Sequence, residues 1–114
     1  MKRLDEIEAR TTAATEGPWT WATHSTADGD EWAVFSPADW ALATNRDGWG
    51  YDAEFIAHAR HDVPALVAAL RAVLELHDEL DGHCWYCRDI NDDSPIPYPC
   101  PAVTTIRQHL GEDA

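Results

Sequence analysis

The apolar positions of the chain follow a helical period in three segments and alternate with polar positions in a fourth. Residues 2–14 place Leu4 and Ile7 on one face, and the Gly-Pro pair that follows predicts the end of a short N-terminal helix. Residues 18–44 show partial alternation between turn signals at the Asp-Gly pair 28–29 and the Pro-Ala pair 37–38. This pattern predicts a meander of two or three short antiparallel strands.

A longer helical pattern begins at Tyr51, with carboxylates in its first turn and Phe55, Ile56 and Ala59 on its expected apolar face. Asp62 is a suitable N-cap for a second helix, since the proline two residues later is tolerated in a first turn. We therefore expect the long helix to break at this point. The apolar spacing then continues to residue 80, and the Asp-Gly pair at 81–82 is expected to end the second helix.

A last short helix is expected from Pro101, because Val103, Ile106 and Leu110 follow at helical spacing. The segment before it is rich in proline and can form neither a helix nor a central strand. The elements together predict one α+β domain over residues 1–114. It would hold a short N-terminal helix and a small antiparallel sheet in 1–50, a broken long helix in 51–81, and a cysteine-rich tail with the C-terminal helix in 82–114.

The charge of the chain narrows the partners that it can take. Its 21 acidic and 8 basic residues give a formal net charge of −13, which repels phosphate backbones and anionic membranes. We expect no direct binding to nucleic acid or membrane, and a partner protein with a basic surface is favoured. The first residues carry no apolar leader, and residues 63–76 are too short to span a bilayer, so a cytoplasmic location is predicted. The sequence does not indicate an oligomeric state.

All three cysteines fall within seventeen residues, two of them as Cys84-x2-Cys87, with Cys100 following after twelve intervening residues. The Cys-x-x-Cys spacing is that of a zinc knuckle, and the start of a helix at Cys100 favours a thiolate. The odd number of cysteines and a reducing cytosol argue against a disulfide framework. Two alternatives remain: three reduced cysteines that pack as small apolar groups, or a redox-active Cys-x-x-Cys pair.

Three thiolates leave one position of a tetrahedral zinc site to fill, and His77, His83 and His109 are the candidates. His83 adjoins the first cysteine, and neighbouring residues rarely point into one coordination sphere. His109 lies nine residues along a helix from Cys100, which is about 13 Å. His77 is the best choice, because the Asp-Gly pair can turn the chain back after it. The sequence therefore predicts a closed, structural Zn²⁺ site that pins the last helix to the long helix.

The first half of the chain is rich in aromatic residues, with five tryptophans among residues 19–49. We expect most of them to form the core between the sheet and the helices. Trp40 and Trp49 lie beside turns and are expected to be exposed. Together with Trp32 and Arg46, they form the predicted surface for a partner, because tryptophan and arginine carry much of the binding energy at interfaces.

No nucleophile stands at a recognisable motif spacing, and no metalloprotease motif or glycine-rich phosphate loop is present, so we do not expect an enzyme. Two interpretations compete. The first is an accessory protein that binds and modulates another protein through an acidic surface bearing tryptophans. The second is a protein that binds a small molecule such as a nucleotide signal, with bases stacked on tryptophan and phosphates held by Arg46, Arg60 or Arg71.

Two segments, 14-ATEGPW-19 and 52-DAEFIAHARHDVPALVAAL-70, resemble the Ead-type family of small phage early-region proteins. The tail, a histidine followed by Cys-x-x-Cys and Pro-Cys-Pro, is similar to that of small phage proteins from high-GC hosts. The resemblance implies a phage or prophage origin and an early, non-structural role in the cytoplasm of the host bacterium. It therefore favours a protein that modulates a host protein, and it implies no reaction.

Overall fold

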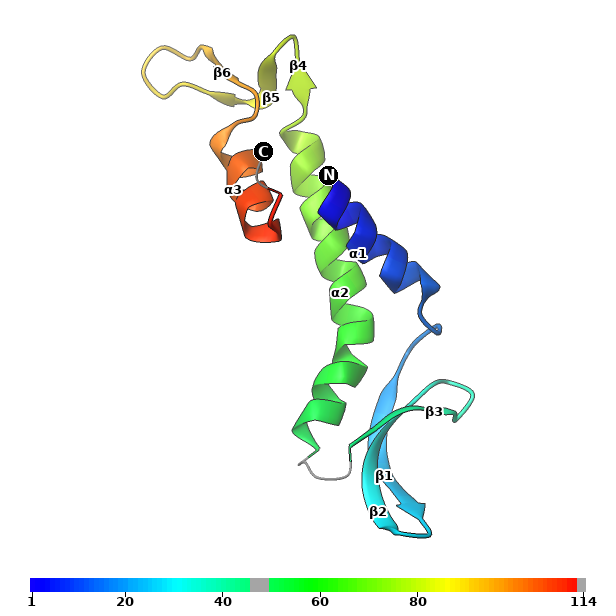
Figure 1. The fold of residues 1–114 in the computed structure, drawn as a ribbon. Coiled ribbons are helices and arrows are strands. Elements are labelled where there is room, and N and C mark those ends of the chain that lie inside the picture. The colour runs from blue at the N-terminus through cyan, green and yellow to red at the C-terminus, as the bar shows by residue number, and fades with distance from the viewer. Residues whose placement is uncertain (46–49, 113–114) are drawn as a thin grey trace. The chain divides into compact units, whose positions relative to one another are not determined.

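The computed structural model describes residues 1–45 and 50–112, and it has the α+β architecture that the sequence predicts (Figure 1). Its helices are α1 (Lys2–Ala13), α2 (Tyr51–Leu76) and α3 (Pro101–Leu110). The strands of a first sheet are β1 (Thr20–Thr26), β2 (Gly29–Phe35) and β3 (Ala41–Asn45), and those of a second are β4 (Glu79–Leu80), β5 (His83–Arg88) and β6 (Pro95–Pro97).

The chain forms two compact units, one of residues 10–65 and one of residues 1–9 with 66–114. The boundaries between the units fall inside α1 and α2, whereas the sequence pattern suggested divisions after residues 50 and 81. The single domain expected over residues 1–114 stays a prediction. Within the described residues, no helix combines the length and the apolar character that crossing a membrane requires.

The unit of residues 10–65 contains the predicted meander. Its strands pair antiparallel in the order β1-β2-β3, with turns at 27–28 and 37–38. Val34 of β2 is buried together with Ala53 and Ala57 of α2. The partly buried residues that pack against this cluster are Trp19, Trp32 and Ala43. The core of this unit therefore lies between the sheet and one face of α2.

The prediction of which face of this part of α2 is buried is wrong. Phe55 is 75% exposed and Ile56 is also exposed, while the two small alanines are buried. Successive helical residues are about 100° apart, so residue 55 lies on the side of the helix opposite residues 53 and 57. Alanine at 53 and 57 lets the helix backbone approach the sheet closely. The small size of the alanine side chains at the contact determines which face of α2 is buried. The prediction was wrong because it assigned the large apolar residues to that face.

The predicted break in the long helix is also absent. Residues 51–76 form one α-helix, with Pro64 in its interior instead of in the first turn of a second helix capped by Asp62. Proline lacks the N–H that would bond to the carbonyl four residues earlier, so one helical hydrogen bond is missing. The alanines and leucines after Pro64 have high helix propensity, which allows the helix to continue.

The unit of residues 1–9 and 66–114 has its own core. Leu4 of α1 is fully buried, and a second buried cluster consists of Cys84, Cys100 and Val103. Met1 and Leu74 are among the side chains that pack against that cluster. Arg71 donates to the carboxylates of Asp5 and Glu8, at 2.7 Å in each case, and so joins the first turns of α1 to α2.

The cysteine-rich tail contains a second antiparallel sheet of order β4-β5-β6, which the sequence pattern did not predict. The helix ends at Leu76, and the Asp-Gly pair forms the turn between β4 and β5, with φ of 53° at Asp81 and 80° at Gly82. Asp-Gly favours a tight hairpin as strongly as a helix end. The prolines of β6 are accommodated because this strand lies at the edge of the sheet.

Candidate metal centre

Four side chains that can bind a metal meet just beyond the end of α2. The Nδ1 atom of His77 lies 3.5 Å from the Sγ atom of Cys84, 3.3 Å from that of Cys87 and 3.5 Å from that of Cys100. All four potential ligand atoms lie within 4.8 Å of one another. In a tetrahedral zinc site, bonds of about 2.3 Å to sulfur and about 2.0 Å to nitrogen separate these atoms by about 3.6 Å. The donor set and its spacing fit this ion.

Three different elements position the four side chains. His77 is the first residue after α2, and its backbone N–H still donates to the carbonyls of Val73 and Leu74 at 3.2 Å. Cys84 and Cys87 both belong to β5. Cys100 is the N-cap of α3, and its carbonyl accepts the N–H of Thr104 at 3.0 Å.

Local hydrogen bonds help to prepare the first cysteine as a thiolate. Burial alone would raise the pKa of Cys84, but the backbone N–H groups of Cys87 and Tyr86 bond to its sulfur, as do the side chains of His77 and Cys100. The N–H of Cys87 lies 3.4 Å from that sulfur. These bonds together lower the pKa of Cys84 to about 6.

The second cysteine is shifted the other way. Burial, reinforced by hydrogen bonds with Cys84 and Cys100, raises the pKa of Cys87 to about 11. All three cysteines are free thiols, and Cys84 and Cys100 are buried. Thiolates this close repel one another in the absence of a cation. A bound divalent cation is what would allow all three to ionise together.

Apolar residues surround the buried part of the cluster. Val103 is buried together with Cys84 and Cys100, and Leu74 and Ile96 pack against them. The ring of His77 also contacts that of Tyr86 edge-on, with 5.5 Å between ring centroids. Four protein ligands in an apolar shell make a closed site, which is typical of a structural metal.

The other two histidine candidates lie outside the cluster. The Nδ1 atom of His83 lies 3.1 Å from the carbonyl of Asp81, that of His109 lies 2.9 Å from the carbonyl of Thr105, and both side chains are exposed. His77 is therefore the histidine that the fold brings to the three cysteines. It follows the helix instead of lying within its last turns, because the helix ends earlier than the spacing predicted.

The residues predicted to meet a partner have different environments. Trp40 is 74% exposed, as expected from its place beside a turn. Trp32 is half-buried on the core cluster, and a Cβ added at Gly50 would lie 3.0 Å from its ring. Trp49 and Arg46 fall outside the described residues. Of the two members of this predicted surface that the structure describes, Trp40 is the exposed one.

The sequence interpretation missed two exposed aromatic residues beside the metal cluster. Trp85 and Tyr86, between the paired cysteines, are 56% and 60% exposed. The signal was available, since two cysteines that turn inward around one ion leave the residues between them facing outward. Trp85 and Tyr86 should have been counted with Trp40 as surface aromatics.

The two motifs that carry the phage resemblance stabilise the unit of residues 10–65. The side chains of Trp19 and Arg60 both donate to the carbonyl of Thr15, at 3.0 Å and 2.9 Å. The guanidinium of Arg60 also lies 5.9 Å from the centroid of the Trp19 ring. The Gly-Pro-Trp element is thus joined to α2 by one arginine.

Comparisons with protein families, with curated proteins and with solved structures find no match for this chain. The resemblance to early-region phage proteins is therefore carried by the two quoted motifs alone.

Proposed function

We propose that His77, Cys84, Cys87 and Cys100 bind one structural Zn²⁺ ion. The observation that carries this proposal is the presence of four donor atoms within 4.8 Å of one another. Three thiolates and one imidazole suit zinc better than the harder cations, which prefer oxygen ligands. The ion would supply a tetrahedral link between the end of α2, strand β5 and the first turn of α3.

Native mass spectrometry of the reduced protein tests this proposal. We expect a mass excess of one zinc ion that is lost in His77→Ala and in Cys100→Ser. The matched controls are His109→Ala and Thr104→Ser, which make similar changes outside the cluster and should keep the metal. A protein that takes up no zinc after reduction and addition of the ion would contradict the proposal.

We further propose that the protein acts by binding another protein and catalyses no reaction itself. Its charge of −13 and its exposed aromatic residues support this role. The exposed aromatic side chains include those of Trp40, Trp85 and Tyr86. A basic surface on the partner would match this charge. The phage resemblance adds that the partner is a host protein in the bacterial cytoplasm, where thiols stay reduced for zinc.

The alternative of a nucleotide-binding protein has less support. Of its three candidate phosphate-binding arginines, Arg60 already bonds to Thr15 and Arg71 to Asp5 and Glu8. Arg46 falls outside the described residues. Native mass spectrometry would detect a copurified nucleotide directly, and such a finding would replace the protein-binding proposal.

Affinity capture from a bacterial lysate tests the binding role. The capture is repeated as the salt concentration rises from about 0.05 M to about 0.5 M, which shortens the screening length several-fold. We expect each specific partner to be basic and to dissociate with rising salt. If every captured protein stayed bound across this range, a partner recognised through its charge would be ruled out.

A further inference from the structure

The unit of residues 1–9 and 66–114 exposes an apolar strip that its own core does not use. On α2, Leu66, Val73 and Leu76 follow one another at spacings of seven and three residues, which places them on one helix face. All three are exposed, as are Leu80 and Trp85 beyond the end of the helix. The apolar spacing that predicted the helix thus marks an outer face, while Val67 and Leu74 face the core.

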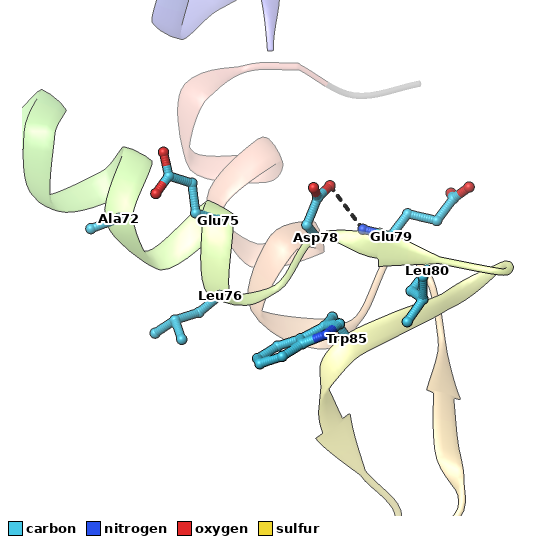
Figure 2. Close-up of a pocket in the computed structure, with 7 residues that line it drawn as sticks. All are labelled: Ala72, Glu75, Leu76, Asp78, Glu79, Leu80 and Trp85. Carbon is cyan, nitrogen blue, oxygen red and sulfur yellow. Dashed lines mark hydrogen bonds between the residues drawn. The ribbon is translucent and has the colours of Figure 1, made fainter.

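The strip leads into a groove between the end of α2 and the β4–β5 hairpin (Figure 2). The groove has a volume of about 460 Å³, and Ala72, Leu76, Leu80 and Trp85 supply its apolar lining. In Figure 2 the indole of Trp85 lies between the side chains of Leu76 and Leu80. A tryptophan beside two leucines offers the kind of surface on which an apolar side chain of a partner can be anchored.

Acidic residues complete the lining of the groove. Glu75, Asp78 and Glu79 contribute three carboxylates, which lie along one edge in Figure 2. The Asp78 carboxylate accepts the backbone N–H of Glu79 at 2.9 Å and so fixes the chain where it leaves the helix. The groove therefore combines an apolar lining with a negative edge.

We propose that this groove binds a cationic amphipathic segment of another protein, in which an apolar side chain is flanked by lysine or arginine. The proposal rests on the protein-binding role given above and assigns it a site. The apolar side chain would fill the lining beside Trp85, and the cations would meet the carboxylates of the edge. A second copy of this chain is disfavoured, because its own groove carries the same negative edge and its net charge is −13.

The direct test uses the full zinc-loaded chain and a fluorescein-labelled helical peptide of leucine and lysine, with binding read by fluorescence anisotropy. One control peptide replaces the leucines by serine and keeps the charge. A second replaces the lysines by glutamate and keeps the apolar face. We expect both controls to bind at least about 30-fold more weakly than the parent peptide, the loss typical of one anchor residue.

Matched variants locate the binding site. Trp85→Ser should weaken binding by about 30-fold, whereas Trp40→Ser removes an exposed tryptophan from the other unit and should leave it unchanged. The double variant Glu75→Gln with Glu79→Gln should weaken binding and flatten its salt dependence. Its control is Glu16→Gln with Glu54→Gln, which makes the same change in charge in the other unit.

A second variant of the groove keeps the test valid if Trp85→Ser also loses zinc. Ala72→Lys places bulk and positive charge at the apolar lining and should abolish binding, while Thr105→Lys on the exposed face of α3 should not. The zinc content of each variant is measured in parallel. Equal effects of Trp85→Ser and Trp40→Ser, or equal binding of the serine-substituted peptide, would show a general attraction of cations and overturn the proposal.

Other occupants of the groove give distinct results. A dimer in sedimentation that Trp85→Ser converts to a monomer would assign the groove to a second copy. Cosedimentation with neutral lipid vesicles that the same variant abolishes would assign it to a membrane. Both results would overturn the proposal. If Trp85→Ser and Ala72→Lys still bound a partner captured from lysate, the groove would be ruled out as the binding site. The protein-binding role would then still hold.

Discussion

The Nδ1 atom of His77 and the Sγ atom of Cys87 lie 3.3 Å apart, although one residue follows a helix and the other lies on a strand. The antiparallel β4–β5 hairpin between them reverses the direction of the chain and makes this approach possible. Cys100 reaches the same point from the start of α3. The cluster thus brings together the end of α2, strand β5 and the start of α3.

Removing the imidazole should weaken zinc binding while leaving the three thiolates in place. We expect His77→Ala to lose more affinity than the 10–100-fold typical of changes outside the ligand set. Competition with a chromophoric chelator measures the affinity. His83→Ala is the control, since its ring lies beside the Asp81 carbonyl instead of in the cluster. An affinity that fell equally in both variants would place the fourth ligand elsewhere.

The metal-free, reduced protein should be most stable near the ordinary thiol pKa of about 8.5. With the pKa of Cys84 lowered to about 6, the unfolded chain holds a proton that the fold has released, so stability rises from about pH 6 upward. With the pKa of Cys87 raised to about 11, the fold keeps a proton that the unfolded chain loses, so stability falls from about 8.5 toward 11.

Urea unfolding at a series of pH values, with chelator and reductant present, measures this profile. Cys84→Ser should remove the contribution that rises with pH, and Cys87→Ser the one that falls. A profile that neither substitution altered would contradict the assigned pKa shifts.

Two leucines of the same unit should respond very differently to truncation. Leu4 is fully buried whereas Leu66 is 64% exposed. We expect Leu4→Ala to lower the free energy of unfolding by about 2–5 kcal/mol, through lost burial and a cavity. Leu66→Ala should change it by no more than about 0.5 kcal/mol. Thermal or urea unfolding checks both, and comparable losses would show that Leu66 is covered in solution.

The turn between β4 and β5 should depend on backbone freedom at Gly82, whose φ is 80°. A Cβ added there would meet no atom within 4 Å, so Gly82→Ala tests conformation without crowding. We expect it to destabilise the fold by about 1–2 kcal/mol and to weaken zinc binding. Gly82→Asn is the control, because asparagine tolerates the left-handed region. Urea unfolding of the zinc-loaded protein compares the three chains.

Much of the fold could be predicted from local sequence features that each indicate a single type of structure. Pro101 at a helix start and Gly111 in the left-handed C-cap define α3, and the alternating aromatic segment forms the expected sheet. The choice of His77 over two other histidines relied only on chain geometry. That choice agrees with the structure because the length of the connection to Cys84 was interpreted correctly, even though its conformation was not.

The remaining errors came from signals with two meanings. The Asp-Gly pair at 81–82 suits a helix end and a hairpin turn equally well, and only the pairing of the flanking strands decides between them. Apolar periodicity identifies a helix and does not say which apolar face is covered. The buried face of α2 depends on how closely its neighbours approach, which small residues such as Ala53 and Ala57 permit.

One unit is built from two distant pieces of the chain, residues 1–9 and residues 66–114. Leu4 is buried in it, and Asp5 and Glu8 hold Arg71. Protein synthesis runs from the N-terminus, and domains generally fold as units while they emerge. The segment 10–65 is thus free to fold on the ribosome first, whereas the initial nine residues must wait until translation delivers the cysteines and α3.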